Sequence, residues 1–152
     1  MIFSWQEVFV ETLKVWACKS RCFHYHIAAI FVRDKRILQI GYNGPTVGDD
    51  HCNDFGCAKE VNGIILPSGS KRCRGAHAEM NAIVNAAKNG INLAGCEVYC
   101  TQSPCYDCAK HLNNMGIKVL YYLKRYEEEF PQASALFERR GIKLIQIKDI
   151  QN

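Results

Sequence analysis

Two short segments of the sequence combine residue types that bind metal ions and move protons. His77 and Glu79 stand two positions apart in "RGAHAEMNAI", and Cys105 and Cys108 follow in "SPCYDCAK". Each pair lies where an apolar helical pattern begins, so all four side chains can converge on an object beyond both helix ends. Imidazole nitrogen and thiolate sulfur are preferred ligands of zinc in proteins. The spacing therefore predicts a zinc ion held by His77, Cys105 and Cys108.

The number of ligands indicates what this ion would do. Three protein ligands leave one position of a tetrahedral zinc ion open, which is typical of catalytic sites. Water bound there loses a proton near neutral pH, and a carboxylate within hydrogen-bond reach can carry that proton away. Glu79 is that carboxylate. The alternatives are a purely structural zinc or a redox pair at the two cysteines, with Glu79 serving only as a helix-start charge.

A second group of metal-binding residue types crowds the segment from 43 to 75. Glycine, aspartate, asparagine and proline are frequent there, and little helical or strand periodicity is visible. A loop of this length is unusual within a compact domain unless something clamps it. A structural zinc ion would supply the folding energy that the loop lacks, and free thiols are the alternative. The ligand candidates in this insert are His51, Cys52, Cys57 and Cys73.

The same spacings contain a competing pattern. A C-x4-C pair starting at Cys52, followed by a C-x3-H pair ending at His77, would by itself match a zinc finger. That assignment would leave the downstream Cys-x-x-Cys pair without a metal, so His77 is assigned to the first ion. The leftover cysteines are expected in the core: Cys18, Cys96 and Cys100.

The N-terminal part of the sequence predicts a helix followed by a hairpin. Ser4 and Glu7 match a capping box, and apolar residues at helical spacing predict a first helix to about Lys19. The segments 26–33 and 37–42 are apolar and flank a short polar turn, which is typical of a β-hairpin.

The C-terminal part alternates between helical patterns and short strands. Strands are predicted at 97–101, 118–123 and 143–147, with Ser103 and Pro104 as the N-cap and first residue of the helix after the first of them. This alternation implies right-handed parallel crossovers. We therefore predict a single α/β domain over residues 1–152 with a mixed sheet of about five strands.

Composition limits the class of protein. Hydrophobic residues make up 48% and charged residues 22% of the 152 residues, which is typical of a globular chain. No apolar run reaches the roughly 20 residues of a membrane span, and no export signal is visible. Nine cysteines without an export signal favour metal binding in the reducing cytoplasm. The modest net charge of +4 argues against nucleic acid as the main partner.

The two reactive segments resemble a known signature. "HAEMNAI" (77–83) with "SPCYDCAK" (103–110) resembles the H-x-E and P-C-x-x-C pattern of the zinc-dependent cytidine deaminase superfamily. "GYNG" (41–44), "CRGAHAEMNAI", "YCTQSPCYDCAK" and "GIKVLYYLKRYEEE" are similar to deoxycytidylate (dCMP) deaminases, including the late-competence type of bacteria. The resemblance covers nearly the whole chain. It implies a three-layer α/β/α sandwich and hydrolytic deamination of dCMP to dUMP and ammonia in pyrimidine metabolism, with Glu79 as the catalytic acid and base.

The resemblance also implies the remaining site residues. It adds Cys22 to Cys52, Cys57 and Cys73 as ligands of the structural zinc, with His51 as the substitute ligand. It implies contacts to the substrate from Asn43, the Ala78 amide and Tyr126. Five basic residues are candidates for the substrate phosphate: Arg21, Lys71, Arg72, Arg74 and Lys124.

Regulation and assembly follow from the same resemblance. Some similar enzymes are activated by dCTP and inhibited by dTTP, and members of the family form homo-oligomers, commonly hexamers and sometimes dimers. Two other functions compete with dCMP deamination. One is deamination of a free base, a nucleoside or a tRNA adenosine, although a tRNA enzyme should carry more positive charge. The other is a non-catalytic, competence-related zinc protein, against which the presence of Glu79 speaks.

Overall fold

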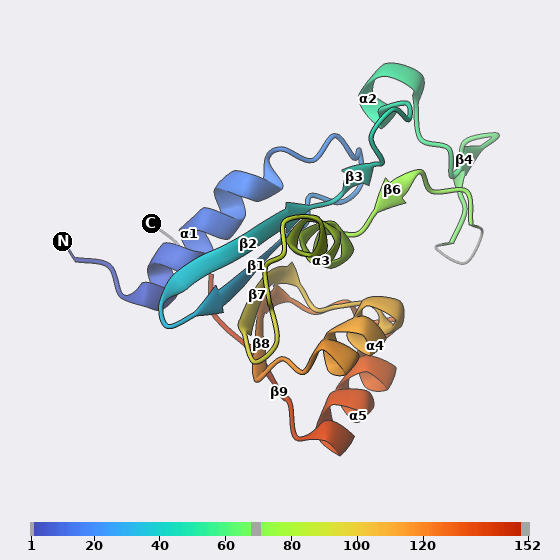
Figure 1. The fold of residues 1–152 in the computed structure, drawn as a ribbon. Coiled ribbons are helices and arrows are strands. Elements are labelled where there is room, and N and C mark those ends of the chain that lie inside the picture. Colours follow the sequence, from blue (N-terminus) through green and yellow to red (C-terminus); the bar gives the residue numbers. More distant parts are fainter. Residues whose placement is uncertain (1, 68–70, 150–152) are drawn as a thin grey trace.

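A central five-stranded sheet organises the computed structural model, which describes residues 2–67 and 71–149 (Figure 1). In spatial order the strands are β2 (Arg36–Tyr42), β1 (Ala28–Arg33), β7 (Glu97–Gln102), β8 (Val119–Lys124) and β9 (Lys143–Gln146). β1 pairs antiparallel with both β2 and β7, whereas β7, β8 and β9 run parallel to one another. The predicted mixed sheet and its parallel crossovers are confirmed.

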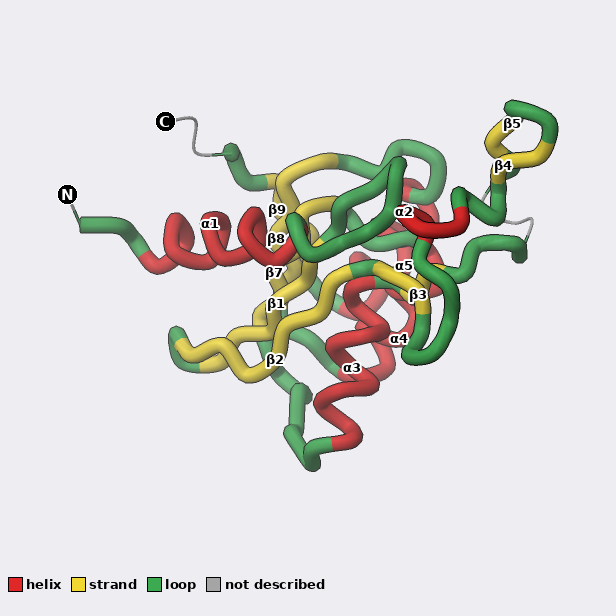
Figure 2. Tube along the Cα trace, turned by 90° about the horizontal axis from the view of Figure 1, so that it is seen from above, coloured by secondary structure: helices red, strands yellow, loops and turns green. Residues whose placement is uncertain are grey.

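Helices cover both faces of this sheet, as Figure 2 shows. Successive residues of a strand point to opposite faces, so Ile30 of β1 packs with α1 (Trp5–Ala17), while Phe31 packs into the core on the other side. That second core is covered by α3 (Ala78–Lys88), α4 (Tyr106–Met115) and α5 (Phe130–Arg140). The three-layer α/β/α sandwich is confirmed. None of the helices among residues 2–67 and 71–149 has the length and apolarity to cross a membrane.

The N-terminal elements form where their local sequence predicts them. Ser4 and Glu7 make the predicted capping box, and α1 ends at Ala17, two residues before the predicted end. β1 and β2 form the predicted hairpin. Its turn places Asp34 and Lys35 at φ values of 50° and 61°, the left-handed geometry that matches the twist of paired strands.

The insert carries short elements of its own and projects from the sandwich (Figure 1). At its base, β3 (Gly44–Pro45) pairs antiparallel with β6 (Gly75–Ala76), so both ends of the insert meet beside α3. This pairing fixes the chain just before His77. Farther out lie α2 (Cys52–Phe55), β4 (Glu60–Val61) and β5 (Ile64–Ile65).

β2 approaches the start of α3 so closely that only glycine fits at position 41. A Cβ on Gly41 would lie 2.1 Å from the Ala78 carbonyl oxygen and 2.6 Å from the Ala82 nitrogen, and neither backbone atom can yield easily. We expect Gly41→Ala to lower the free energy of unfolding by about 3 kcal/mol or more. Urea denaturation measures this change.

Gly44→Ala is the matched control, because nothing lies within 4 Å of a Cβ at that position. It should unfold within about 1 kcal/mol of the wild-type protein. Equal stability of both variants would contradict the close approach of β2 to α3.

Candidate metal centre

The two predicted metal-binding segments sit at the N-terminal ends of α3 and α4. His77 is the N-cap of α3 and Cys105 the N-cap of α4, both with extended backbone, and Cys108 is the third helical residue of α4. The prediction of Ser103 as the N-cap and Pro104 as the first residue of this helix was wrong, because α4 begins at Tyr106. The Cys105 sulfur takes that role by accepting the Cys108 N–H at 3.4 Å, and the buried Ser103 hydroxyl instead accepts the N–H of Tyr126 at 2.7 Å.

The three predicted ligands converge. His77 Nδ1 lies 3.3 Å from Cys105 Sγ and 3.4 Å from Cys108 Sγ, and all three donor atoms lie within 4.8 Å of one another. Tetrahedral zinc with ordinary Zn–N and Zn–S bonds requires N···S separations of about 3.6 Å. The donor set and its spacing therefore fit zinc. Within the described part of the chain, this is the one such group of three or more donors.

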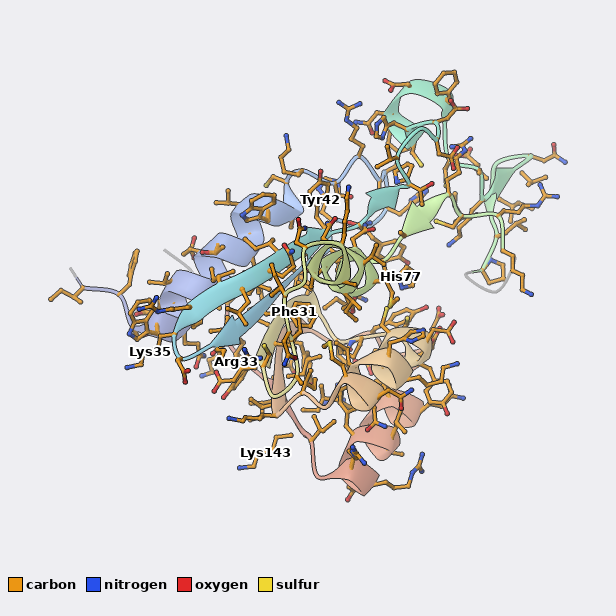
Figure 3. All side chains as sticks on the ribbon, viewed as in Figure 1. Phe31, Arg33, Lys35, Tyr42, His77 and Lys143 are labelled. Carbon is orange, nitrogen blue, oxygen red and sulfur yellow. The ribbon has the colours of Figure 1, made fainter. Side chains whose placement is uncertain are left out.

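The three predicted metal ligands differ in burial. Cys108 is buried, Cys105 is half-buried and His77 is exposed between α3 and the start of α4 (Figure 3). Hydrogen bonds with Cys108 and His77 lower the pKa of Cys105 to about 4, and the bond to Cys105 raises the pKa of His77 to about 9. These shifts favour a Cys105 thiolate paired with a protonated His77, and the imidazole would lose its proton when it binds zinc. The exposed side of His77 would give a further ligand access to a metal ion held by these three residues.

Glu79 lies beside this group in the first turn of α3 and is only 4% exposed. Burial raises the pKa of its carboxyl group, and the neighbouring Cys105 thiolate raises it further. A carboxyl group whose pKa moves towards neutrality can both accept and donate a proton near pH 7. The predicted proton carrier is therefore buried next to the predicted metal ligands.

Asn81 anchors the start of α3, a role that the sequence did not reveal. Its side-chain amide donates to the Tyr42 carbonyl at 2.8 Å and to the Ala76 carbonyl at 3.5 Å. These bonds join the ends of β2 and β6 to the helix that begins after His77. An amide one turn into an otherwise apolar helical stripe was the available sign of such a role.

The start of α4 is tied to the segment that follows β8. The Glu129 carboxylate accepts the N–H of Tyr106 at 2.6 Å, and Ser103 accepts the N–H of Tyr126. Both bonds fix the loop around Cys105. Tyr126 itself is half-buried, and its hydroxyl donates to Glu128 at 3.1 Å.

The other two predicted substrate contacts lie at the start of α3 and directly after β2. Ala78 is fully buried as the first residue of α3. Asn43 accepts the N–H of Ile27 at 2.9 Å and donates to the Tyr25 carbonyl at 3.0 Å. The structure thus gives Asn43 a bracing role, and its contact to a substrate stays a prediction.

The cysteines of the predicted structural site share one neighbourhood. Burial raises the pKa of Cys52, and the thiols of Cys22, Cys57 and Cys73 are close enough to raise it further. The Cys22 sulfur accepts the N–H of Tyr25 at 3.4 Å, and the Cys73 sulfur accepts the N–H of Gly75 at 3.4 Å. In residues 2–67 and 71–149 these sulfur atoms do not form a group as tight as the His77 group.

His51 and the three cysteines that were assigned to no metal site complete the comparison with the sequence. The Nδ1 atom of His51 is buried and has no hydrogen-bond partner among the described residues. A buried nitrogen without a partner is costly and favours a ligand there. The three cysteines outside the predicted metal sites differ in burial. Cys96 and Cys100 are buried as expected, but Cys18 is exposed at the end of α1, so its assignment to the core was wrong.

The sequence matches a protein family and is similar to several characterised proteins. Residues 3–124 match the family described as "Cytidine and deoxycytidylate deaminase zinc-binding region". ComE operon protein 2 of Bacillus subtilis is 37% identical over 145 residues, covering 95% of this chain and 72% of the relative. The deoxycytidylate deaminase of Enterobacteria phage T4 is 31% identical over 159 residues, covering 85% and 82%.

A solved structure resembles the fold over almost its full length. The dCMP deaminase of cyanophage S-TIM5, determined in complex with dCMP and dUMP, superimposes with a TM-score of 0.79. It is 28% identical in sequence, and the match covers 97% of this chain and 99% of that one.

Proposed function

Because the chain belongs to the cytidine and deoxycytidylate deaminase zinc-binding family, we propose that it converts dCMP to dUMP and ammonia by hydrolysis. The observation that carries the proposal is the buried Glu79 beside three donors spaced for zinc. The similarity of this chain to a deaminase whose structure was solved with dCMP and dUMP supports a nucleotide substrate.

His77, Cys105 and Cys108 would hold the zinc ion, which when bound makes water a nucleophile near neutral pH. Glu79 accepts the proton of the attacking water and donates a proton to N3 of the cytosine ring. The carboxylate then takes the proton of the new C4 hydroxyl group and passes it to the departing amine, so ammonia leaves, the C4 carbonyl forms, and one residue serves as base and acid. Backbone N–H groups at the starts of α3 and α4 favour negative charge that develops on the ring, and we assign this role to the amide of Ala78, the first residue of α3.

A direct assay tests the substrate assignment. Zinc-loaded protein is incubated with dCMP, deoxycytidine, cytosine or guanine, and the ultraviolet spectrum and released ammonia are followed. We expect turnover of dCMP. Turnover of deoxycytidine but not of dCMP would reject the nucleotide assignment, and no ammonia from any compound would favour the non-catalytic zinc protein.

We further propose that Cys22, Cys52, Cys57 and Cys73 hold a structural zinc ion that clamps the insert. The shared neighbourhood of these thiols supports it, and the unpartnered nitrogen of His51 supports His51 as the substitute ligand. Such an ion would fix the insert to the end of α1.

Metal analysis tests this second ion. We expect about two zinc ions per chain after dialysis, falling to about one in Cys52→Ser, because a hydroxyl replaces a thiolate ligand. Loss of one ion in Cys22→Ser but not in His51→Gln would assign the site to the four cysteines, and the reverse would assign it to His51. A value near one in the wild-type protein would remove the proposal.

The remaining proposals concern the domain, assembly, effectors, substrate contacts and location of the enzyme. Residues 1–152 form one domain that works as a homo-oligomer, either hexamer or dimer, with dCTP and dTTP as effectors. Asn43, Ala78 and Tyr126 contact the substrate. The nine cysteines, all free in the structure, support a reducing cytoplasm as its location.

A further inference from the structure

Glu129 stands at the start of α5, but its side chain serves a different helix. It is the N-cap residue of α5, yet its side chain makes no capping hydrogen bond to that helix, which lies wholly in the described part of the chain. The carboxylate instead accepts the N–H of Tyr106, the first residue of α4, at 2.6 Å. α4 and α5 lie side by side, although 23 positions separate the two residues (Figure 1). Capping of α5 therefore does not explain the acid at position 129.

This hydrogen bond holds the backbone next to a predicted metal ligand. The N–H of Tyr106 belongs to the planar peptide group that follows Cys105, so an acceptor at this N–H fixes the ψ angle of Cys105. That angle is 166°, an extended value, and Cys105 is the N-cap of α4. Its ψ angle sets how the Cys105 side chain is directed relative to the helix that begins after it. The Glu129 carboxylate thus holds the Cys105 sulfur in its direction relative to α4.

The Cys105 sulfur makes two contacts that depend on this direction. It accepts the N–H of Cys108 at 3.4 Å and lies 3.3 Å from His77 Nδ1. The first partner belongs to α4, whereas the second stands at the start of α3. A rotation about ψ of Cys105 therefore moves its sulfur relative to both partners. Metal–ligand distances tolerate deviations of only about 0.2 Å, so a small rotation is enough to weaken zinc binding.

The Glu129 carboxylate is well placed to resist such a rotation. Glu129 is half-buried, whereas Glu127 and Glu128 before it are exposed. An ionised acceptor makes shorter and stronger hydrogen bonds than a neutral one, and the N-terminal end of a helix favours a negative charge. A second bond holds the same pair of loops, because the Ser103 N–H donates to the Lys124 carbonyl at 2.8 Å. Glu129 is therefore fixed relative to the segment that carries Cys105.

Glu129 supports the metal ligands without belonging to them. The donors grouped for a metal ion in the described part of the chain are His77, Cys105 and Cys108, and Glu129 is not among them. It is nevertheless close to His77, since its charge adds to the rise in the pKa of His77 that the bond to Cys105 mainly causes. Groups just outside the ligands of a metal ion commonly orient those ligands.

We propose that Glu129 is a positioning residue of the metal centre, which holds the Tyr106 N–H and thereby keeps the Cys105 sulfur where zinc requires it. The proposal rests on the metal centre of the proposed deaminase and assigns no proton transfer to Glu129. The essential feature is an acceptor oxygen that reaches Tyr106, and the negative charge is secondary. Loss of this acceptor acts first on the affinity for zinc, because it loosens a ligand.

Three substitutions at position 129 separate the hydrogen bond from the charge. Glu129→Ala removes both, and the Kd for the catalytic zinc ion should rise about 10- to 100-fold. Glu129→Asp keeps the charge, but its shorter side chain does not reach Tyr106, and the Kd should rise about tenfold. Glu129→Gln keeps an acceptor oxygen at the same reach and should stay within about threefold of wild type. The matched control is Glu127→Ala, which removes an exposed carboxylate of the same segment and should leave the Kd unchanged.

Two measurements follow the metal directly. Competition with a chromophoric chelator gives the Kd for zinc, and Cys108→Ser identifies which ion is the catalytic one. The thiolate-to-metal absorption band of the cobalt-substituted protein is the second readout, because it responds to the arrangement of the sulfur ligands rather than to the stability of the fold. We expect the part of this band that is absent in Cys108→Ser to shift in Glu129→Ala and Glu129→Asp, and to stay in place in Glu129→Gln.

Two results would overturn the proposal. One is wild-type zinc affinity and an unshifted cobalt band in Glu129→Ala and Glu129→Asp. The other is weakened zinc binding in Glu129→Gln but not in Glu129→Asp, because the charge and not the hydrogen bond would then act. Should Glu129→Ala fail to fold, Glu129→Asp decides, since aspartate is a favoured N-cap residue for α5. Both readouts are independent of turnover, so the expected zinc affinities in protein that leaves dCMP unchanged would support the role of Glu129 and reject only the deaminase function.

Discussion

Replacing Glu79 with glutamine is expected to lower kcat for dCMP by about 10³- to 10⁴-fold while the protein keeps its metal. Glutamine has nearly the shape of a carboxyl group but cannot accept a proton from water or pass one to the ring and the amine. Glu79 is buried beside the three ligands and is not one of their group, so its replacement leaves the metal site intact. KM should change much less than kcat, because the proton transfers occur only in the chemical steps.

Single-turnover measurements and zinc analysis on the same sample check this expectation. Glu138→Gln on the exposed face of α5 is the matched control and should retain wild-type activity. Glu79→Gln protein that carries full zinc and keeps kcat within tenfold of wild type would remove Glu79 from the chemistry. Loss of zinc together with activity would instead assign Glu79 to the support of the metal.

The second large effect is expected for Cys108→Ser, which should lose the catalytic zinc and reduce ammonia release to background. Cys108 is 1% exposed, and its sulfur atom lies 3.4 Å from His77 Nδ1. A serine hydroxyl remains protonated near pH 7 and is a poor zinc ligand, so only two effective ligands would remain. Zinc content after dialysis should fall by about one ion per chain.

Cys18→Ser provides the comparison for this change. Cys18 is exposed at the end of α1, where its thiol donates to the Lys14 carbonyl at 3.3 Å. This variant should keep both zinc and activity. Cys108→Ser protein with the wild-type zinc content and turnover within tenfold of wild type would contradict the three-ligand centre.

Local patterns in the sequence determined the reactive groups and most of the elements that carry them. The spacing of His77 and of the Cys-x-x-Cys pair, each at a helix start, predicted the ligands that the structure brings together. The hairpin of β1 and β2 and the alternation of strands and helices from residue 76 were also predictable. Each of these features depends on residues within one turn of a helix or one pair of adjacent strands, so neighbouring positions suffice to define it.

Contacts between distant segments were decided only by the tertiary structure. Gly41 must be glycine because α3 crosses β2 at backbone distance, and Asn81 joins that helix to Tyr42. Arg125 meets the segment 24–27 across a cavity, although about 100 residues separate them in the chain. Strand order, register and helix placement create these neighbours, and no local periodicity specifies them. The reactive residues were therefore visible in the sequence, whereas the groups that position them and the cavity beyond the strand ends were not.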